Sequence, residues 1–176
     1  FTISLWTPAE LSSLALWLDA MDESRILRDA NSRVSQWSDK SGNNRHVYQE
    51  TGNLRPLYSS ASSPAGNKPA IVYPDTDTGA KLNTTITFPL REIYFVCTYK
   101  NGLDNTFDNY DAIISCNGDQ YGVPRICGSQ STDKIHVEVD GWKRADVYKN
   151  GSSESSTTIL PMSLCILRGK FTQTHN

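Results

Sequence analysis

Two acids in the second half of the chain, Glu138 and Asp140, have types and spacing that suggest chemistry. In retaining glycosidases, two carboxyl groups about 5 Å apart serve as nucleophile and general acid. A hydrolase strand of the pattern E-x-D-x-x-E needs one more glutamate, and Lys143 stands in its place. We therefore expect Glu138 and Asp140 to be solvent-facing acids near a strand end. We expect no glycoside hydrolysis from them and no catalytic residues in the chain.

The same stretch contains Trp142, which is the strongest candidate for binding a sugar. Glycan sites need an aromatic face that stacks on the ring, with rigid polar groups beside it that bond the hydroxyls. A polar turn before Trp142 would expose its ring, and the neighbouring charges would orient hydroxyls or an acidic sugar. The alternative is an aromatic side chain that is exposed but binds nothing. The candidate ligand-binding residues are Trp142, Asp140, Lys143, Arg144 and Tyr121, with Tyr110 and Tyr148 as weaker stacking candidates.

Aspartates in turns are the only candidates for a metal site. Oxygen ligands suit calcium, and four such residues could supply them, although no EF-hand pattern is present. Each position is also explained by the ability of aspartate to form turns. Calcium therefore stays an open possibility, with Asp39, Asp75, Asp77 and Asp104 as the residues concerned.

The four cysteines show neither C-x-x-C nor Cys/His ligand spacing, which argues against a structural zinc. Small apolar cysteines suit the core of a sandwich, so buried free thiols are expected. Disulfides are the alternative, and sequence cannot choose among the three possible ways of pairing all four. The residues are Cys97, Cys116, Cys127 and Cys165.

Composition excludes several classes of protein. The chain has 176 residues and a net charge of −2, which offers no electrostatic surface for nucleic acid or an anionic membrane. No apolar run approaches the roughly 20 residues of a membrane-spanning helix, so we expect no membrane insertion. No G-x-S-x-G motif or phosphate-binding glycine pattern is present either.

A turn signal follows the tryptophan strand at 34–38, in the run Asp39-Lys40-Ser41-Gly42-Asn43. Aspartate and serine side chains bond nearby backbone amides, and Gly42 or Asn43 can take the positive φ of a tight reversal. We expect Asp39 to cap this loop, and His46 to hold the loop in place rather than to act as a base.

Four blocks of sequence resemble the concanavalin A-like, laminin-G-type family of jelly rolls. The blocks are LWLDA at 16–20, VSQWSDKSGNNRH at 34–46, RPLY at 55–58 and NKPAIVY at 67–73. The resemblance implies an all-β jelly-roll sandwich of one domain over 1–176, with Trp17 and Trp37 in its core. It also implies further strands after residue 170. We therefore expect a longer natural protein, and an exposed edge or apolar patch next to Leu164 to Leu167.

Short strands separated by turn signals, with almost no helical periodicity, predict the same class. A capping box at Thr7-Pro8-Ala9-Glu10 predicts a short lead-in helix near 7–14. Residues 91–99 form the strongest strand, which we expect to be central and buried on both faces. The other predicted strands span 34–38, 70–73, 112–116, 121–127, 134–139, 144–148 and 164–169.

The resemblance is to modules of bacterial secreted proteins and phage structural proteins. It favours a non-enzymatic module that binds glycan or a surface polymer, outside the cell or on a virion, as part of a larger assembly. A purely architectural domain, contacting other copies or subunits without a sugar ligand, is the alternative. A glycan hydrolase or lyase comes third.

Overall fold

The computed structural model describes residues 6–74, 79–86, 90–99, 112–115, 125–128, 135–136, 138–139, 142–143, 145–153 and 162–175. Every pairing between its strands is antiparallel, and the helical segments of the described part are four single 3-10 turns. The expected all-β class is therefore confirmed, and the jelly-roll topology stays a prediction. No described helix is long and apolar enough to cross a membrane.

The chain divides into two compact units. Unit 1 comprises residues 1–63 and 67–87, and unit 2 comprises residues 64–66 and 88–176. The expectation of a single domain over 1–176 stays a prediction, and each unit is described by itself.

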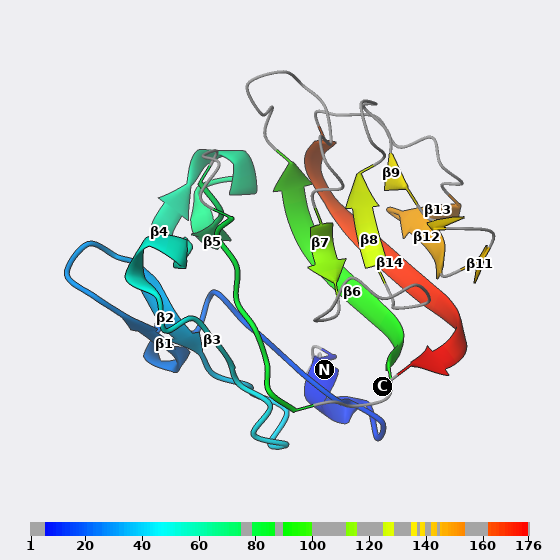
Figure 1. The fold of residues 1–176 in the computed structure, drawn as a ribbon, viewed down its shortest axis with the longest axis horizontal. Helices are drawn as coiled ribbons and strands as arrows, with labels where there is room; N and C mark the ends of the chain where they lie inside the picture. Colours follow the sequence, from blue (N-terminus) through cyan, green and yellow to red (C-terminus); the bar gives the residue numbers. More distant parts are fainter. Residues whose placement is uncertain are drawn as a thin grey trace, which may run out of the picture. The chain divides into compact units, whose positions relative to one another are not determined.

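Unit 1 contains a three-stranded sheet in the order β1-β2-β3 and a hairpin of β4 and β5 (Figure 1). Single bridges, Arg33 to Leu57 and Tyr48 to Asn83, add to these pairings. The η4 turn (Ser63–Ala65) separates β4 from β5. The other elements are η1 (Pro8–Glu10), η2 (Glu23–Arg25), β1 (Ile26–Arg28), β2 (Val34–Trp37), β3 (Val47–Tyr48), η3 (Gly52–Leu54), β4 (Leu57–Ser62) and β5 (Lys68–Val72).

The core of unit 1 joins strands from three of the four resembling blocks. Ile26, Val34 and Tyr58 are buried in one cluster, and Trp37, Ile71 and Leu82 pack against it. The fully buried Pro56 accepts a hydrogen bond of 2.8 Å at its carbonyl from the Val34 N–H. The tryptophan strand, the RPLY block and the NKPAIVY block therefore pack together.

The expected helix near 7–14 is wrong in length. The structure has one 3-10 turn at Pro8–Glu10, and Leu11 is already extended at φ −78° and ψ 114°. The N-terminal signal is present, because the Thr7 N–H donates to Glu10 Oε1 at 2.9 Å. No residue of the turn is buried, so no packed apolar face stabilises a longer helix.

Unit 2 contains a four-stranded sheet in the order β13-β12-β14-β6, a three-stranded sheet β7-β8-β9 and the hairpin β10-β11. The long β6 and β14 lie side by side, with β7 and β8 across them in Figure 1. The elements are β6 (Leu90–Tyr99), β7 (Ala112–Ser115), β8 (Arg125–Gly128), β9 (Ile135–His136), β10 (Glu138–Val139), β11 (Trp142–Lys143), β12 (Ala145–Lys149), β13 (Ser152–Ser153) and β14 (Met162–His175).

One core lies between the two larger sheets of unit 2. Its buried residues come from β8, β12 and β14, and partly buried residues of β6 and β7 pack against them. The buried members are Ile126, Val147, Cys165, Leu167 and Phe171. Unit 2 is thus a two-layered antiparallel structure.

The expectation that residues 91–99 are buried on both faces is wrong. Along β6, Ile93, Phe95 and Cys97 pack against the core, whereas Tyr94 and Val96 are 58% and 76% exposed. Among the described strands, β6 is outermost in its sheet and pairs with β14 alone. The second sheet therefore covers one face of β6. On the opposite face, the side chains of Tyr94 and Val96 are exposed.

The last predicted strand is longer than expected and lies inside the sheet. β14 pairs with β12 on one side and β6 on the other over Leu167–Lys170, so β14 is not itself the edge there, and β6 beside it is the outermost described strand. The apolar patch expected as its alternative is found, because Leu164 and Ile166 are 45% and 51% exposed.

The two sheets of unit 2 pack closely against each other at Gly169. An added Cβ would lie 2.6 Å from Ile126 Cδ1 and 3.3 Å from Ile93 Cγ2, and Ile126 is fully buried. We expect Gly169→Ala to lower the free energy of unfolding by about 1–3 kcal/mol through overpacking. Chemical denaturation measures this loss.

A second variant provides the control. Ile126→Val removes Cδ1, the atom that the new methyl group would meet. Alone it should cost about 0.5–1.5 kcal/mol, and together with Gly169→Ala it should cost clearly less than the sum of the two single changes. Strictly additive losses would contradict the close approach of β8 and β14.

Candidate functional site

Part of the predicted glycan site is described, and only through its backbone. Trp142 and Lys143 form β11, where they pair with Val139 and Glu138 of β10. Trp142 thus begins a short strand, and the exposure of its ring stays a prediction. Glu138 and Lys143 therefore lie on two paired strands, whereas the hydrolase pattern has its first and last acids on one strand. Asp140, Arg144, Tyr121 and Tyr110 lie outside the described residues.

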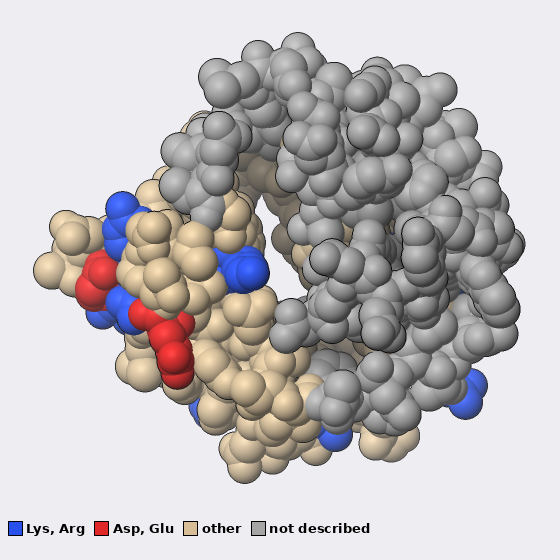
Figure 2. All heavy atoms as spheres, viewed as in Figure 1, with Lys and Arg blue, Asp and Glu red and all other residues tan. Residues whose placement is uncertain are grey.

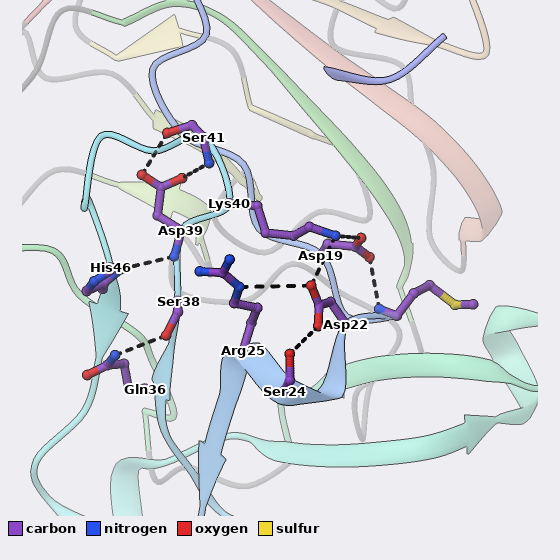
Figure 3. A network of polar contacts seen from close by, with 11 residues as sticks. Asp19, Asp22, Ser24, Arg25, Gln36, Ser38, Asp39, Lys40, Ser41 and His46 are labelled. Atoms are coloured by element: carbon purple, nitrogen blue, oxygen red, sulfur yellow. Dashed lines mark hydrogen bonds and ion pairs between the residues drawn. The ribbon is translucent and has the colours of Figure 1, made fainter. Parts of the chain in front are cut away.

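The best-defined polar site is the loop that follows β2 (Figure 3). Asp39 is 3% exposed. Its Oδ1 accepts from the backbone N–H groups of Trp17 at 3.0 Å and Ser41 at 2.8 Å. Its Oδ2 accepts from the N–H of Arg45 at 3.0 Å and from Ser41 Oγ at 2.7 Å. The carboxylate therefore has the capping role that the sequence predicts.

The loop also binds the first sequence block. The Lys40 N–H donates to the Trp17 carbonyl at 2.7 Å. Asn43 Nδ2 donates to the Leu14 carbonyl at 2.8 Å, and Arg45 Nη1 donates to the Ala15 carbonyl at 3.0 Å. Residues 14–17 are thus attached to the loop, with the Asp39 carboxylate at the centre of the contact.

His46 and Gly42 have the structural roles expected of them. The Asp39 N–H donates to His46 Nδ1 at 3.1 Å, so this nitrogen acts as the acceptor. Gly42 has a φ of +88°, which favours glycine. The second positive φ lies at Asn44, at +56°, rather than at Asn43.

The environment of Asp39 determines its charge. Burial alone raises the pKa of the carboxyl, but hydrogen bonds from the backbone of Trp17, Ser41 and Arg45 outweigh burial and hold the pKa below its usual value. Four donors fill about four lone-pair positions of the carboxylate, which favours a structural role over calcium binding. Asp75, Asp77 and Asp104 lie outside the described residues. The described residues hold no group of three or more potential His, Cys, Asp or Glu ligands.

Trp17 is half-buried, and a lysine covers its ring. Lys40 Nζ lies 4.5 Å from the ring centroid, 2.7 Å from Asp19 Oδ2 and 3.2 Å from Asp22 Oδ2. The bond to Asp19 is the largest cause that raises the pKa of Lys40. Hydrogen bonds from Ser24 and then Lys40 lower the pKa of Asp22. These charges are paired with one another and stabilise the loop and its neighbours.

Opposite charges also alternate elsewhere on unit 1. Figure 2 shows acidic and basic side chains next to one another on the visible face of this unit. Arg28 pairs with Glu23, and Arg55 Nη1 lies 3.8 Å from Asp29 Oδ2. Among the described residues of unit 1, this surface therefore has no patch of positive charge alone, which is what nucleic-acid binding would favour.

A second candidate site lies in unit 2, on the face of the β12-β14-β6 sheet that points away from the core. We name it the outer face. The strand register places its side chains in cross-strand rows. One row is charged, one combines aromatic rings with a guanidinium, and one is largely aliphatic. The rows are Glu92, Lys170 and Asp146; Tyr94, Arg168 and Tyr148; and Val96, Ile166 and Asn150.

Arg168 organises the middle row. Its guanidinium carbon lies 5.7 Å from the ring centroid of Tyr94 and 5.1 Å from that of Tyr148. Arg168 Nη2 and Nε donate to the two Glu92 carboxylate oxygens at 2.8 and 3.3 Å. The Tyr94 hydroxyl donates to Glu92 Oε2 at 2.8 Å. Hydrogen bonds to Glu92 therefore hold Tyr94 and the guanidinium, and the Tyr148 ring lies on the other side of the guanidinium row.

The charges of this cluster support one another. The bond to Arg168, and then the bond from Tyr94, lower the pKa of Glu92, so the carboxylate stays charged in mildly acidic solution. The cluster can present aromatic surface and guanidinium N–H groups that Glu92 does not occupy. That combination suits stacking on a sugar ring with hydrogen bonds to its hydroxyls.

Sequence reasoning included Tyr148 as a weak stacking candidate and missed Tyr94 and Arg168. Tyr94 lies in the strand that was expected to be buried on both faces. The signal was nevertheless present, because Glu92, Tyr94 and Val96 alternate with Ile93, Phe95 and Cys97. The charge of Glu92 marks which of the two sets faces solvent.

No family model, curated protein or solved structure matches the chain.

Proposed function

We propose that the protein is a non-enzymatic recognition module of the concanavalin A-like, laminin-G-like jelly-roll type that binds glycan. The observation that supports it best is the row of Tyr94, Arg168 and Tyr148 on the outer face, in which Glu92 bonds both Tyr94 and Arg168. The resemblance of the four sequence blocks supports the fold part of the proposal. We place the module in a secreted surface protein or a phage structural protein, outside the cell or on the virion.

The physical basis is preorganisation. Binding is weakened by the ordering of flexible side chains, and Arg168 is already ordered by Glu92 and the two rings. Tyr94 is 58% exposed, so a sugar can approach it. A single shallow site of this kind should bind in the millimolar to micromolar range, equivalent to about −4 to −8 kcal/mol. Several copies in one assembly would then provide useful adhesion.

The test is a multivalent fusion of the full chain, applied to a glycan array and to bacterial cells. We expect Tyr94→Ala to weaken binding at least about tenfold, because truncating a central aromatic side chain costs about 2 kcal/mol or more. Tyr94→Phe is the matched control, since it keeps the ring and loses only the hydroxyl bond to Glu92. The melting temperature should stay nearly unchanged in both variants.

Trp142→Ala tests the location. Loss of binding in Trp142→Ala, with Tyr94→Ala unaffected, would place the site at the β10-β11 hairpin, as the sequence predicts. A multivalent fusion that binds no glycan and no cell surface would contradict the glycan proposal altogether.

An architectural role is the second candidate, and the aliphatic end of the outer face favours it. Val96, Ile166 and Leu164 expose apolar surface side by side on β6 and β14. Such surface suits contact with another copy or another subunit of an assembly. In that case Val96→Ser would change the state of assembly. Neither the unaltered protein nor Tyr94→Ala would bind glycan. Glycan cleavage comes third, since Lys143 stands where the hydrolase pattern has its last acid.

A further inference from the structure

Two of the four cysteines face each other directly in the largest sheet of unit 2. In the antiparallel register of β6 and β14, Cys97 is the partner of Cys165, next to the pairs Val96 with Ile166 and Phe95 with Leu167. Both cysteines belong to the inward face, where Cys165 is 4% exposed and Cys97 packs against the core. Neither is in a disulfide.

This placement meets the geometric requirement of a disulfide. Directly opposed residues of antiparallel strands have Cα atoms about 4.5–5.5 Å apart, within the range of about 4.4–6.8 Å that disulfides span. Their Cβ atoms are typically about 4.5–5.5 Å apart, somewhat more than the usual 3.5–4.5 Å of a disulfide. A small approach of the two strands therefore suffices, and the resulting bond would be more easily reduced than an unstrained one.

We propose that Cys97 and Cys165 are a redox-responsive pair that forms a reversible cross-strand disulfide by exchange with a small-molecule disulfide such as oxidised glutathione. One protein thiolate attacks the reagent, forms a mixed disulfide and releases one reduced thiol. The second protein thiolate attacks that mixed disulfide, forms the Cys97–Cys165 bond and releases the second reduced thiol. The protein loses two electrons and two protons, which leave as the two reduced thiols.

Access to the pair sets the rate of this exchange. Burial, followed by the neighbouring Cys165, raises the pKa of the Cys97 thiol to about 12, so little of it is thiolate at neutral pH. Cys97 lies in β6, which is the outermost strand of its sheet among those described. Local opening of β6 would expose the pair, so exchange should be slow in the folded protein and faster under mildly destabilising conditions.

The experiment uses the full chain equilibrated in glutathione buffers of increasing oxidised fraction, followed by acid quenching, alkylation, digestion and mass spectrometry. The expected product is a peptide linking Cys97 to Cys165, with a mass loss of about 2 Da that reduction reverses. The bond should raise the melting temperature by roughly 5–10 °C, because it restricts the unfolded chain.

Two sets of variants make the assignment specific. The double variant Cys116→Ser with Cys127→Ser keeps only the proposed pair and should still form the bond. Cys97→Ser and Cys165→Ser should each abolish the rise in melting temperature on oxidation. Because the linked peptide is detected in the unaltered protein, the test does not depend on the folding of any variant. Linkage to Cys116 or Cys127 instead, or free Cys97 and Cys165 at every buffer ratio, would overturn the proposal.

Discussion

Asp39→Ala should lower the free energy of unfolding by about 3–5 kcal/mol, because it leaves several buried donors without their acceptor. Three backbone N–H groups and one hydroxyl donate to the carboxylate, which is 3% exposed. The methyl group of alanine accepts none of these bonds, and the contact with residues 14–17 loses its centre. Urea denaturation followed by tryptophan fluorescence measures the loss.

Ser41→Ala is the matched control in the same loop. It removes the hydroxyl that donates to Asp39 at 2.7 Å and keeps the Ser41 N–H that donates at 2.8 Å. The hydroxyl also accepts from the Asn43 N–H at 3.3 Å and from Asn43 Nδ2 at 3.0 Å, both in an exposed part of the loop. The expected loss is about 1–2 kcal/mol, because solvent can replace these exposed bonds. If Asp39→Ala cost no more than Ser41→Ala, the central role of the carboxylate would be refuted.

The same site predicts a dependence on pH. The pKa of Asp39 is lower in the folded protein than its usual value, so the folded state binds the proton less readily than the unfolded chain. The contribution of Asp39 is therefore fully present above the unfolded-state pKa of about 4 and is lost as the pH falls through the lower folded-state value. Stability of Asp39→Ala should accordingly fall less steeply than that of the unaltered protein below about pH 4.

Trp37→Ala should cost about 3 kcal/mol, at the lower end of the range of about 3–5 kcal/mol for truncating a core aromatic residue. The lower value is expected because Trp37 is partly buried, although it packs against the cluster of Ile26, Val34 and Tyr58. The loss combines removed contacts with a cavity at the end of β2. Thermal and urea unfolding should agree on its size.

Trp37→Phe separates the contribution of the aromatic ring from that of the indole N–H. The indole Nε1 is buried and has no hydrogen-bond partner among the described residues. Phenylalanine keeps one aromatic ring and removes the unpaired N–H, so its cost should be about 1 kcal/mol or less. An equal loss in Trp37→Phe and Trp37→Ala would show that the ring does not pack in the unit 1 core.

The features that sequence predicted well depend on local rules. Gly42 in the positive-φ region, the capping role of Asp39 and the contact of His46 with the loop follow from residues within a few positions of one another. The all-β class likewise follows from short alternating segments and turn residues. Such interactions need no knowledge of which strand lies beside which.

The features that sequence missed depend on long-range pairing. Nothing local indicates that β6 pairs with β14, which lies far along the chain, or that β14 is flanked by strands on both sides. The exposure of Tyr94 and Val96 and the opposition of Cys97 to Cys165 both follow from that pairing. The predicted length of the lead-in helix was wrong for a related reason, because the length of a helix depends on packing that the capping signal does not specify.

The interior position of β14 has a consequence for how unit 2 is completed during synthesis. β14 is the last described strand of the chain, and it connects β12 and β13 to β6. Until residues 162–175 leave the ribosome, β6 has no partner in its sheet among the described strands. Contacts in unit 1, by contrast, join residues that are synthesised close together, such as those of β4 and β5. The first-made unit can therefore form its sheets while the nascent β6 still lacks β14, and an unpaired strand of this kind can pair with another chain during that interval.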